Sequence, residues 1–77
     1  MTEPIALVTG GNRGIGLAIA QELRSQGAQV VVTYRTGSAP DGFAGVQMDV
    51  TSTESVDAGF TQIEAKFGVP EIIVANA

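Results

Sequence analysis

Thr9-Gly10-Gly11-Asn12-Arg13-Gly14-Ile15-Gly16 is the stretch of sequence that decides the fold. It follows Ile5–Val8, an apolar run that is too short for a helix and is typical of a strand buried on both faces of a parallel sheet. After it, apolar residues recur at the helical spacing i, i+3, i+4 and i+8; these are Ile15, Ala18, Ile19 and Leu23. The stretch is therefore predicted to be the turn between a buried strand and an amphipathic helix.

A glycine-rich turn in this position can hold a phosphate. It presents free backbone N–H groups and the positive end of the helix dipole, and glycines let a pyrophosphate approach the backbone. A P-loop is excluded, because Leu17 and Ala18 stand where that motif needs lysine and a hydroxyl residue. The pattern T-G-x-x-x-G-x-G also differs from the G-x-G-x-x-G fingerprint. A purely structural turn is the alternative, but the setting between strand and helix favours phosphate binding.

Further elements are predicted outward from this turn. Gly27 follows the first helix as a C-terminal cap. Thr51 and Glu54 have the capping-box spacing and should open a second helix, which Gly68 and Pro70 end. The core face of that helix is predicted to consist of Val56, Phe60, Ile63 and Phe67. The remaining segments are a strand over 30–34, a loop over 36–45 and strands over 45–50 and 72–75.

Strands that alternate with helices predict an α/β fold with right-handed crossovers. We expect a Rossmann-type, doubly wound parallel sheet of strand order 3-2-1-4, with one helix on each face and truncated after the fourth strand. Residues 1–77 would form the N-terminal half of a dinucleotide-binding domain, without a second domain. Because nothing follows to cover the fourth strand's apolar edge, we expect the chain to be the first part of a longer fold.

The composition excludes several classes of protein. The 77 residues contain no cysteine and no histidine, which argues against disulfides, zinc sites and a Ser-His-Asp triad. A formal net charge of −4 argues against a nucleic-acid partner. No apolar run approaches the roughly 18 residues of a membrane span, and no targeting segment is visible at the N-terminus. We expect a cytoplasmic protein without a membrane partner.

Three motifs together resemble the short-chain dehydrogenase/reductase family. The stretch 9–16 is similar to that family's cofactor signature, Asp49-Val50 to its adenine-side pair, and Asn76-Ala77 to the start of its Asn-Ala-Gly motif. The family usually has Asn-Asn-Ala-Gly, and Ala75 stands here in place of the first Asn. In finer detail, residues 9–22 and 49–51 resemble the actinobacterial 3-oxoacyl-[acyl-carrier-protein] reductases. The resemblance implies hydride transfer from NADPH to an acyl thioester.

The loop chemistry and the resemblance give ten candidate cofactor-binding residues: Gly10, Asn12, Arg13, Gly14, Ile15, Gly16, Arg35, Asp49, Val50 and Asn76. NADPH is favoured over NADH because Arg35 stands where NAD-preferring folds place an acid, and a guanidinium can hold a 2′-phosphate. The arginines could instead be ordinary surface residues. Asp49 could bind adenine or cap the turn over 51–53, and Asn76 could contact the nicotinamide side or only bridge strands.

The expected function is therefore the NADPH-binding part of an oxidoreductase that reduces 3-oxoacyl thioesters in fatty-acid elongation. A homo-oligomer is expected for the full-length protein. No catalytic residue or metal ligand is predicted within the 77 residues: Tyr34 is the only tyrosine, and Ser38 stands where a Tyr-x-x-x-Lys pair needs lysine. Alone, the chain should be inactive and poorly stable. The alternative is a non-catalytic dinucleotide-binding module, such as a redox sensor or scaffold.

Overall fold

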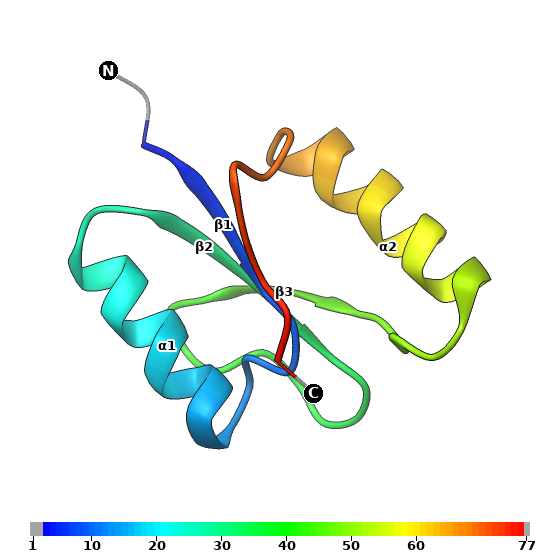
Figure 1. Cartoon of the computed structure of the whole chain (residues 1–77), viewed down its shortest axis with the longest axis horizontal. Coiled ribbons are helices and arrows are strands. Elements are labelled where there is room, and N and C mark those ends of the chain that lie inside the picture. Colours follow the sequence, from blue (N-terminus) through cyan, green and yellow to red (C-terminus); the bar gives the residue numbers. More distant parts are fainter. Residues whose placement is uncertain (1–2, 77) are drawn as a thin grey trace.

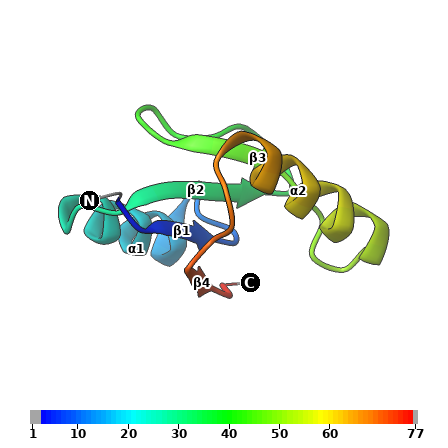
Figure 2. The ribbon, with the colours of Figure 1, turned by 90° about the horizontal axis from the view of Figure 1, so that it is seen from above.

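The computed structural model describes residues 3–76 and contains one parallel sheet with two helices (Figure 1). The elements are β1 (Ile5–Val8), α1 (Gly14–Ser25), β2 (Gln29–Tyr34), β3 (Ala44–Gln47), α2 (Thr53–Lys66) and β4 (Ile72–Val74). The strand order is β3-β2-β1-β4, which Figure 2 shows from above and which confirms the predicted order. Ala77, the second residue of the Asn-Ala pair, lies outside the described residues.

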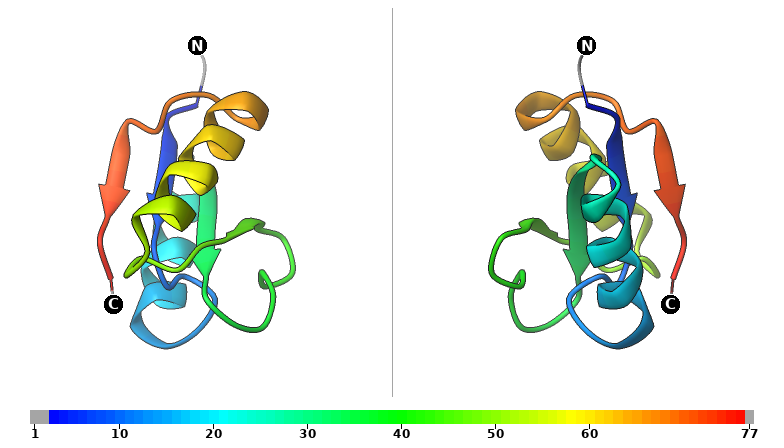
Figure 3. Two further views of the ribbon diagram at one scale, coloured as in Figure 1. Left: turned by 90° about the vertical axis from the view of Figure 1, so that its right-hand side faces the viewer. Right: turned by 90° about the vertical axis from the view of Figure 1, so that its left-hand side faces the viewer.

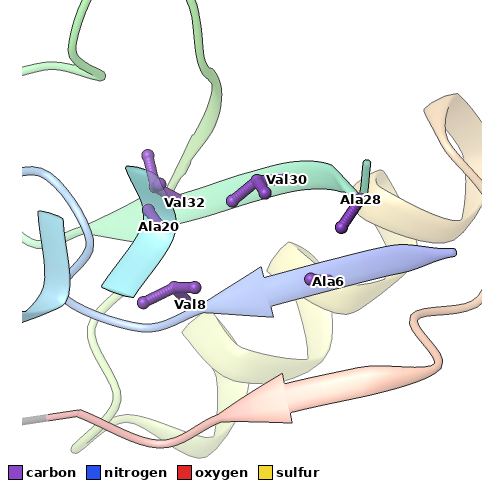
Figure 4. Close-up of a cluster of buried hydrophobic side chains, with 6 residues drawn as sticks. All are labelled: Ala6, Val8, Ala20, Ala28, Val30 and Val32. Carbon is purple, nitrogen blue, oxygen red and sulfur yellow. The ribbon is translucent and has the colours of Figure 1, made fainter. Parts of the chain in front are cut away.

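The two helices cover opposite faces of the sheet (Figure 3). Successive side chains of a strand point to opposite faces, so the strands divide their apolar residues between two cores. One core contains Ala6, Val8, Val30 and Val32 with Ala20 of α1 (Figure 4). The other contains Leu7, Val31, Val46 and Met48 with Ile63 of α2. The prediction of one helix on each face is confirmed.

The helical face of α1 differs from the predicted one. Ile15 is 74% exposed and Ala18 is also exposed, whereas Gly16 and Ala20 are buried. The observed inner face is Gly16, Ile19, Ala20 and Leu23. The physical reason is the small size of Gly16 and Ala20 on this face, which lets the backbone of α1 approach the glycine loop and the valines of the sheet. Ile15 is thereby turned toward solvent.

The start of α2 also differs from prediction, whereas its core face is confirmed. Val56, Phe60 and Phe67 pack around the core that contains Ile63. The N-cap is Ser52, whose Oγ accepts from the Ser55 N–H at 3.3 Å, and not Thr51. Thr51 stays outside the helix because its N–H and hydroxyl both donate to the Asp49 carboxylate, a charged and therefore stronger acceptor.

Two predicted strands are shorter than expected. β3 ends at Gln47 rather than at Val50, because Asp49 and Val50 belong to the turn that leads into α2. β4 ends at Val74, one residue before Ala75. β4 forms one edge of the sheet beside β1, and its Ile73 is 56% exposed.

Arg24 fastens the loop between β2 and β3 to α1. Its Nη1 donates to the Gly42 carbonyl at 3.1 Å, and its guanidinium carbon lies 4.3 Å from the centre of the Phe43 ring. An exposed cation–π contact contributes about 0.5–1 kcal/mol, and a hydrogen bond adds about 0.5–1.5 kcal/mol.

Arg24→Ala is therefore expected to lower the free energy of unfolding by about 1–2 kcal/mol and to accelerate amide exchange at Phe43. Hydrogen exchange followed by NMR measures the second effect. Gln21→Ala, one turn earlier on the same helix, serves as the control and should leave the exchange at Phe43 unchanged. Identical exchange rates in the two variants would contradict the fastening role.

Candidate functional site

A cleft of about 620 Å³ opens at the carboxyl ends of β1, β2 and β3, where ligands bind in open α/β sheets. Nine of the ten predicted site residues line it: Gly10, Asn12, Arg13, Gly14, Ile15, Arg35, Asp49, Val50 and Asn76. Gly16 does not line it. Four further lining residues were not predicted: Thr33, Thr36, Met48 and Thr51. All four lie within two residues of a predicted one, so the strand-end position is the signal that could have found them.

The first turn of α1 offers unpaired N–H groups at this cleft. The N-cap is Arg13, which in residues 3–76 makes no side-chain capping bond, and the first turn contains no acidic residue. The first bond of the helix runs from the Leu17 N–H to the Arg13 carbonyl, so the amides of residues 14–16 have no partner in the preceding turn. α2 contrasts with α1, since Ser52 caps it and Glu54 lies in its first turn. The start of α1 is the one suited to an anion.

Gly14 and Gly16 are required here for different reasons. Gly14 has φ +61°, a conformation that residues with a side chain rarely adopt. At Gly16 the space is closed, because a Cβ would overlap the Gly10 carbonyl oxygen and lie 2.6 Å from the Asn76 Nδ2. Gly16 thus lets the helix close onto the loop rather than exposing backbone to the cleft.

Positive charge gathers at the cleft beside the β2 carboxyl end. Arg13 from the glycine loop and Arg35 after β2 both line the cleft and are both exposed. The backbone of this corner is held by side chains, because the Asn12 Nδ2 donates to the Thr36 carbonyl and the Gln47 Nε2 to the Arg35 carbonyl, each at 3.2 Å. The Asn12 amide therefore links the glycine loop to the segment that carries Arg35.

Asp49 lies in the turn after β3 and is an ionised acceptor. Its Oδ1 accepts from the Thr51 hydroxyl at 2.6 Å and from the Thr51 N–H at 3.0 Å. These two hydrogen bonds lower the pKa of Asp49 below its ordinary value. Burial opposes them with a smaller effect, and the positive charge of Arg35 adds the weakest, lowering contribution. The turn-capping alternative is thus realised in the structure, while the same carboxylate lines the cleft.

Asn76 bridges the ends of β1 and β4. Its N–H donates to the Thr9 Oγ1 at 2.8 Å, the Thr9 hydroxyl lies 2.9 Å from the Asn76 carbonyl oxygen, and its Nδ2 lies 3.4 Å from the Gly10 carbonyl. The strand-bridging alternative is therefore the one that these hydrogen bonds support. A smaller hollow of about 200 Å³ adjoins this end and is lined by Thr9, Val50, Ala75 and Asn76.

Within residues 3–76, no group of three or more histidine, cysteine, aspartate or glutamate side chains is placed to hold a metal ion. Neither α1 nor α2 in this part of the chain is long and apolar enough to cross a membrane.

The chain belongs to the short-chain dehydrogenase family. A sequence model of that family, described as short chain dehydrogenase, matches residues 4–77. The resemblance found in the three motifs is thereby confirmed.

Relatives and a solved structure refine this placement. The chain is similar to the 3-oxoacyl-[acyl-carrier-protein] reductase MabA of Mycobacterium avium, with 55% identity over 71 residues that cover 92% of this chain and 28% of that protein. It is 40% identical over 85 residues to the reductase FabG of Haemophilus influenzae, which covers all of this chain and 35% of that protein. The ligand-free aldohexose dehydrogenase of Thermoplasma acidophilum superimposes with a TM-score of 0.89 at 28% identity, over 97% of this chain and 29% of that one. The chain thus spans about a third of these relatives or less.

Proposed function

We propose that this chain binds NADPH in the cleft and forms the cofactor-binding part of an oxidoreductase that reduces 3-oxoacyl thioesters in fatty-acid elongation. The observation that carries the proposal is the uncapped start of α1 beside two arginines. A dinucleotide phosphate has two anionic groups, a pyrophosphate and a 2′-phosphate. The amides of residues 14 and 15, which line the cleft, suit the first, and Arg13 and Arg35 suit the second.

The rest of the cleft suits the two ends of the dinucleotide. Asp49 and Val50 would lie against the adenine, since the Asp49 carboxylate is available to accept from an amino group. The end beside Thr9 and Asn76, where β1 and β4 meet, would receive the nicotinamide side. The exposed Ile15 side chain lines the cleft and would pack against the cofactor.

The substrate class is supported by the relatives MabA and FabG, which are named as 3-oxoacyl-[acyl-carrier-protein] reductases. When bound, the cofactor supplies a hydride for the keto carbon of such a thioester. This chain's own residues would bind and orient the cofactor. The family's proton donor, a Tyr-x-x-x-Lys pair, is absent from the 77 residues.

Fluorescence titration with NADPH and NADH tests the cofactor. We expect NADPH to bind about 10–100-fold more tightly, because charge-assisted hydrogen bonds to a phosphate contribute about 1.5–3 kcal/mol. Equal affinities would contradict the assignment of the arginines to a 2′-phosphate. Binding of neither dinucleotide would contradict the proposed function altogether.

Incubation of the 77-residue chain with NADPH and a 3-oxoacyl thioester tests whether these residues bind the cofactor without catalysing the reduction. No oxidation of NADPH is expected, because the chain lacks the family's proton donor. Turnover would contradict this expectation and would place a proton donor among the residues of this chain. NADPH binding without turnover is also what a redox sensor or scaffold would show, so the discriminating measurement is the same assay on a protein that carries these residues together with a Tyr-x-x-x-Lys pair.

A further inference from the structure

The Asp49 carboxylate at the cleft accepts two hydrogen bonds from Thr51, one from its side chain and one from its main chain. Both hydrogen bonds from Thr51, through its hydroxyl at 2.6 Å and its N–H at 3.0 Å, go to the same oxygen, Oδ1. Thr51 is exposed and lines the cleft beside Asp49. The other carboxylate oxygen, Oδ2, is left as the acceptor for a ligand.

We propose that Thr51 is a positioning residue that orients Asp49 so that the site discriminates an amino-bearing purine from a carbonyl-bearing one. The proposal rests on the proposed function, because it assumes that the purine end of a dinucleotide lies against Asp49. An ionised carboxylate only accepts hydrogen bonds. A correctly oriented Oδ2 would therefore accept from the 6-amino group of adenine and repel the 6-carbonyl oxygen of hypoxanthine.

The backbone at Asp49 is held independently of the Thr51 side chain. The Asp49 N–H donates to the Ser55 Oγ at 2.8 Å, and the Ser55 N–H in turn donates to the Ser52 Oγ. The first turn of α2 thus fixes the main chain of the turn, while Thr51 fixes only the carboxylate. Removal of the Thr51 hydroxyl leaves only the 3.0 Å hydrogen bond from the Thr51 N–H, so the carboxylate should be oriented less firmly while the turn stays closed.

Hydrogen bonds from Thr51, more than nearby charges, favour the ionised form of the Asp49 carboxylate. The pKa of Asp49 is lowered mainly by the Thr51 hydroxyl, then by the Thr51 N–H, with Arg35 adding a weaker effect. Arg35 lies after β2 and Arg13 in the glycine loop, and both line the same cleft. Without the hydroxyl, the pKa of Asp49 should rise toward its ordinary value.

The test compares the dissociation constants of NADPH and of its hypoxanthine analogue, reduced nicotinamide hypoxanthine dinucleotide phosphate. The unsubstituted protein should prefer NADPH by about 10–100-fold, since one charge-assisted hydrogen bond is lost and a repulsion is added. Thr51→Val should reduce this preference to about threefold or less. Thr51→Ser keeps the hydroxyl and should keep the preference, as should the matched control Thr53→Val at the start of α2.

Two further outcomes separate positioning from a structural role. NMR titration of the Asp49 carboxyl carbon without cofactor should show a higher pKa in Thr51→Val than in Thr51→Ser. An unchanged preference in Thr51→Val, or an equal loss of affinity for both dinucleotides, would overturn the proposal. If the unsubstituted protein binds both dinucleotides equally, the inference fails and the proposed function stands. If it binds neither, the proposed function itself fails.

Discussion

Replacement of Gly16 by alanine is expected to weaken NADPH binding by about 100-fold or more, although Gly16 does not line the cleft. The added Cβ would overlap the Gly10 carbonyl oxygen and lie 2.6 Å from the Asn76 Nδ2. The closest of these atoms belongs to the backbone, so relief requires the glycine loop to move away from α1. Such overpacking costs about 1–3 kcal/mol, and the displaced loop no longer presents its amides to a phosphate. Fluorescence titration with NADPH measures the loss.

Two other variants isolate the cause of this effect. Gly14→Ala meets open space but must adopt φ +61°, which costs about 1–2 kcal/mol, so it should weaken binding by about tenfold. Ala18→Leu adds bulk on the exposed side of the same helix and should leave the affinity unchanged. Circular dichroism should show α1 retained in every variant. Unchanged NADPH affinity in Gly16→Ala would show that the loop does not have to close onto the helix for binding.

The parallel sheet could be predicted because its strands have short, nearly continuous apolar runs separated by turns and helical patterns. Ile5–Val8 and the valines of β2 do not alternate with polar residues, which indicates a strand buried on both faces. The structure places these residues in both cores. The position of the cleft could also be predicted, because it depends only on the strands being parallel. Residues that end β1, β2 and β3 must meet at one edge when the strands are parallel.

The rotation of α1 could not be predicted from its apolar spacing. Gly16 and Ala20 carry little hydrophobic signal, yet their small size decides which side of the helix faces the sheet. The apolar spacing therefore grouped Ile15 with the inward-facing residues, whereas the structure leaves it exposed beside the cleft, among the predicted cofactor-binding residues. The cleft residue Thr51 was not predicted as a site residue, because its spacing to Glu54 indicated a helix cap, whereas the structure bonds it to the Asp49 carboxylate.

The contact between Arg24 and Phe43 could not be predicted from the sequence either. It joins α1 to a loop without periodicity, and only the fold of that loop brings the Phe43 ring under the guanidinium. The same holds for the Asn12 amide. No motif indicated its hydrogen bond to the Thr36 carbonyl, and Asn12 also lines the cleft as a candidate cofactor-binding residue.

Replacement of Arg35 by aspartate is expected to invert the cofactor preference. The backbone at this position is held by the Gln47 amide, so the substitution changes the side chain without moving the corner of the cleft. Loss of a charge-assisted contact costs about 1.5–3 kcal/mol, and the new carboxylate adds repulsion. NADPH should therefore bind at least about 100-fold more weakly, whereas NADH should bind as well as before or better, because an acid there can accept from the ribose 2′-hydroxyl. Parallel titrations with the two dinucleotides measure the ratio.

The control for this inversion has to separate a local contact from a change in total charge. Lys66→Asp changes the net charge by the same amount in the last turn of α2, outside the cleft. It should leave the ratio of NADPH to NADH affinity unchanged, because separated surface charges are screened beyond about 10 Å at 0.1 M salt. The preference of the unsubstituted protein should also weaken as salt is raised, since it depends on an exposed guanidinium and a phosphate. If Lys66→Asp shifted the ratio as far as Arg35→Asp, overall charge and not Arg35 would govern the preference for NADPH.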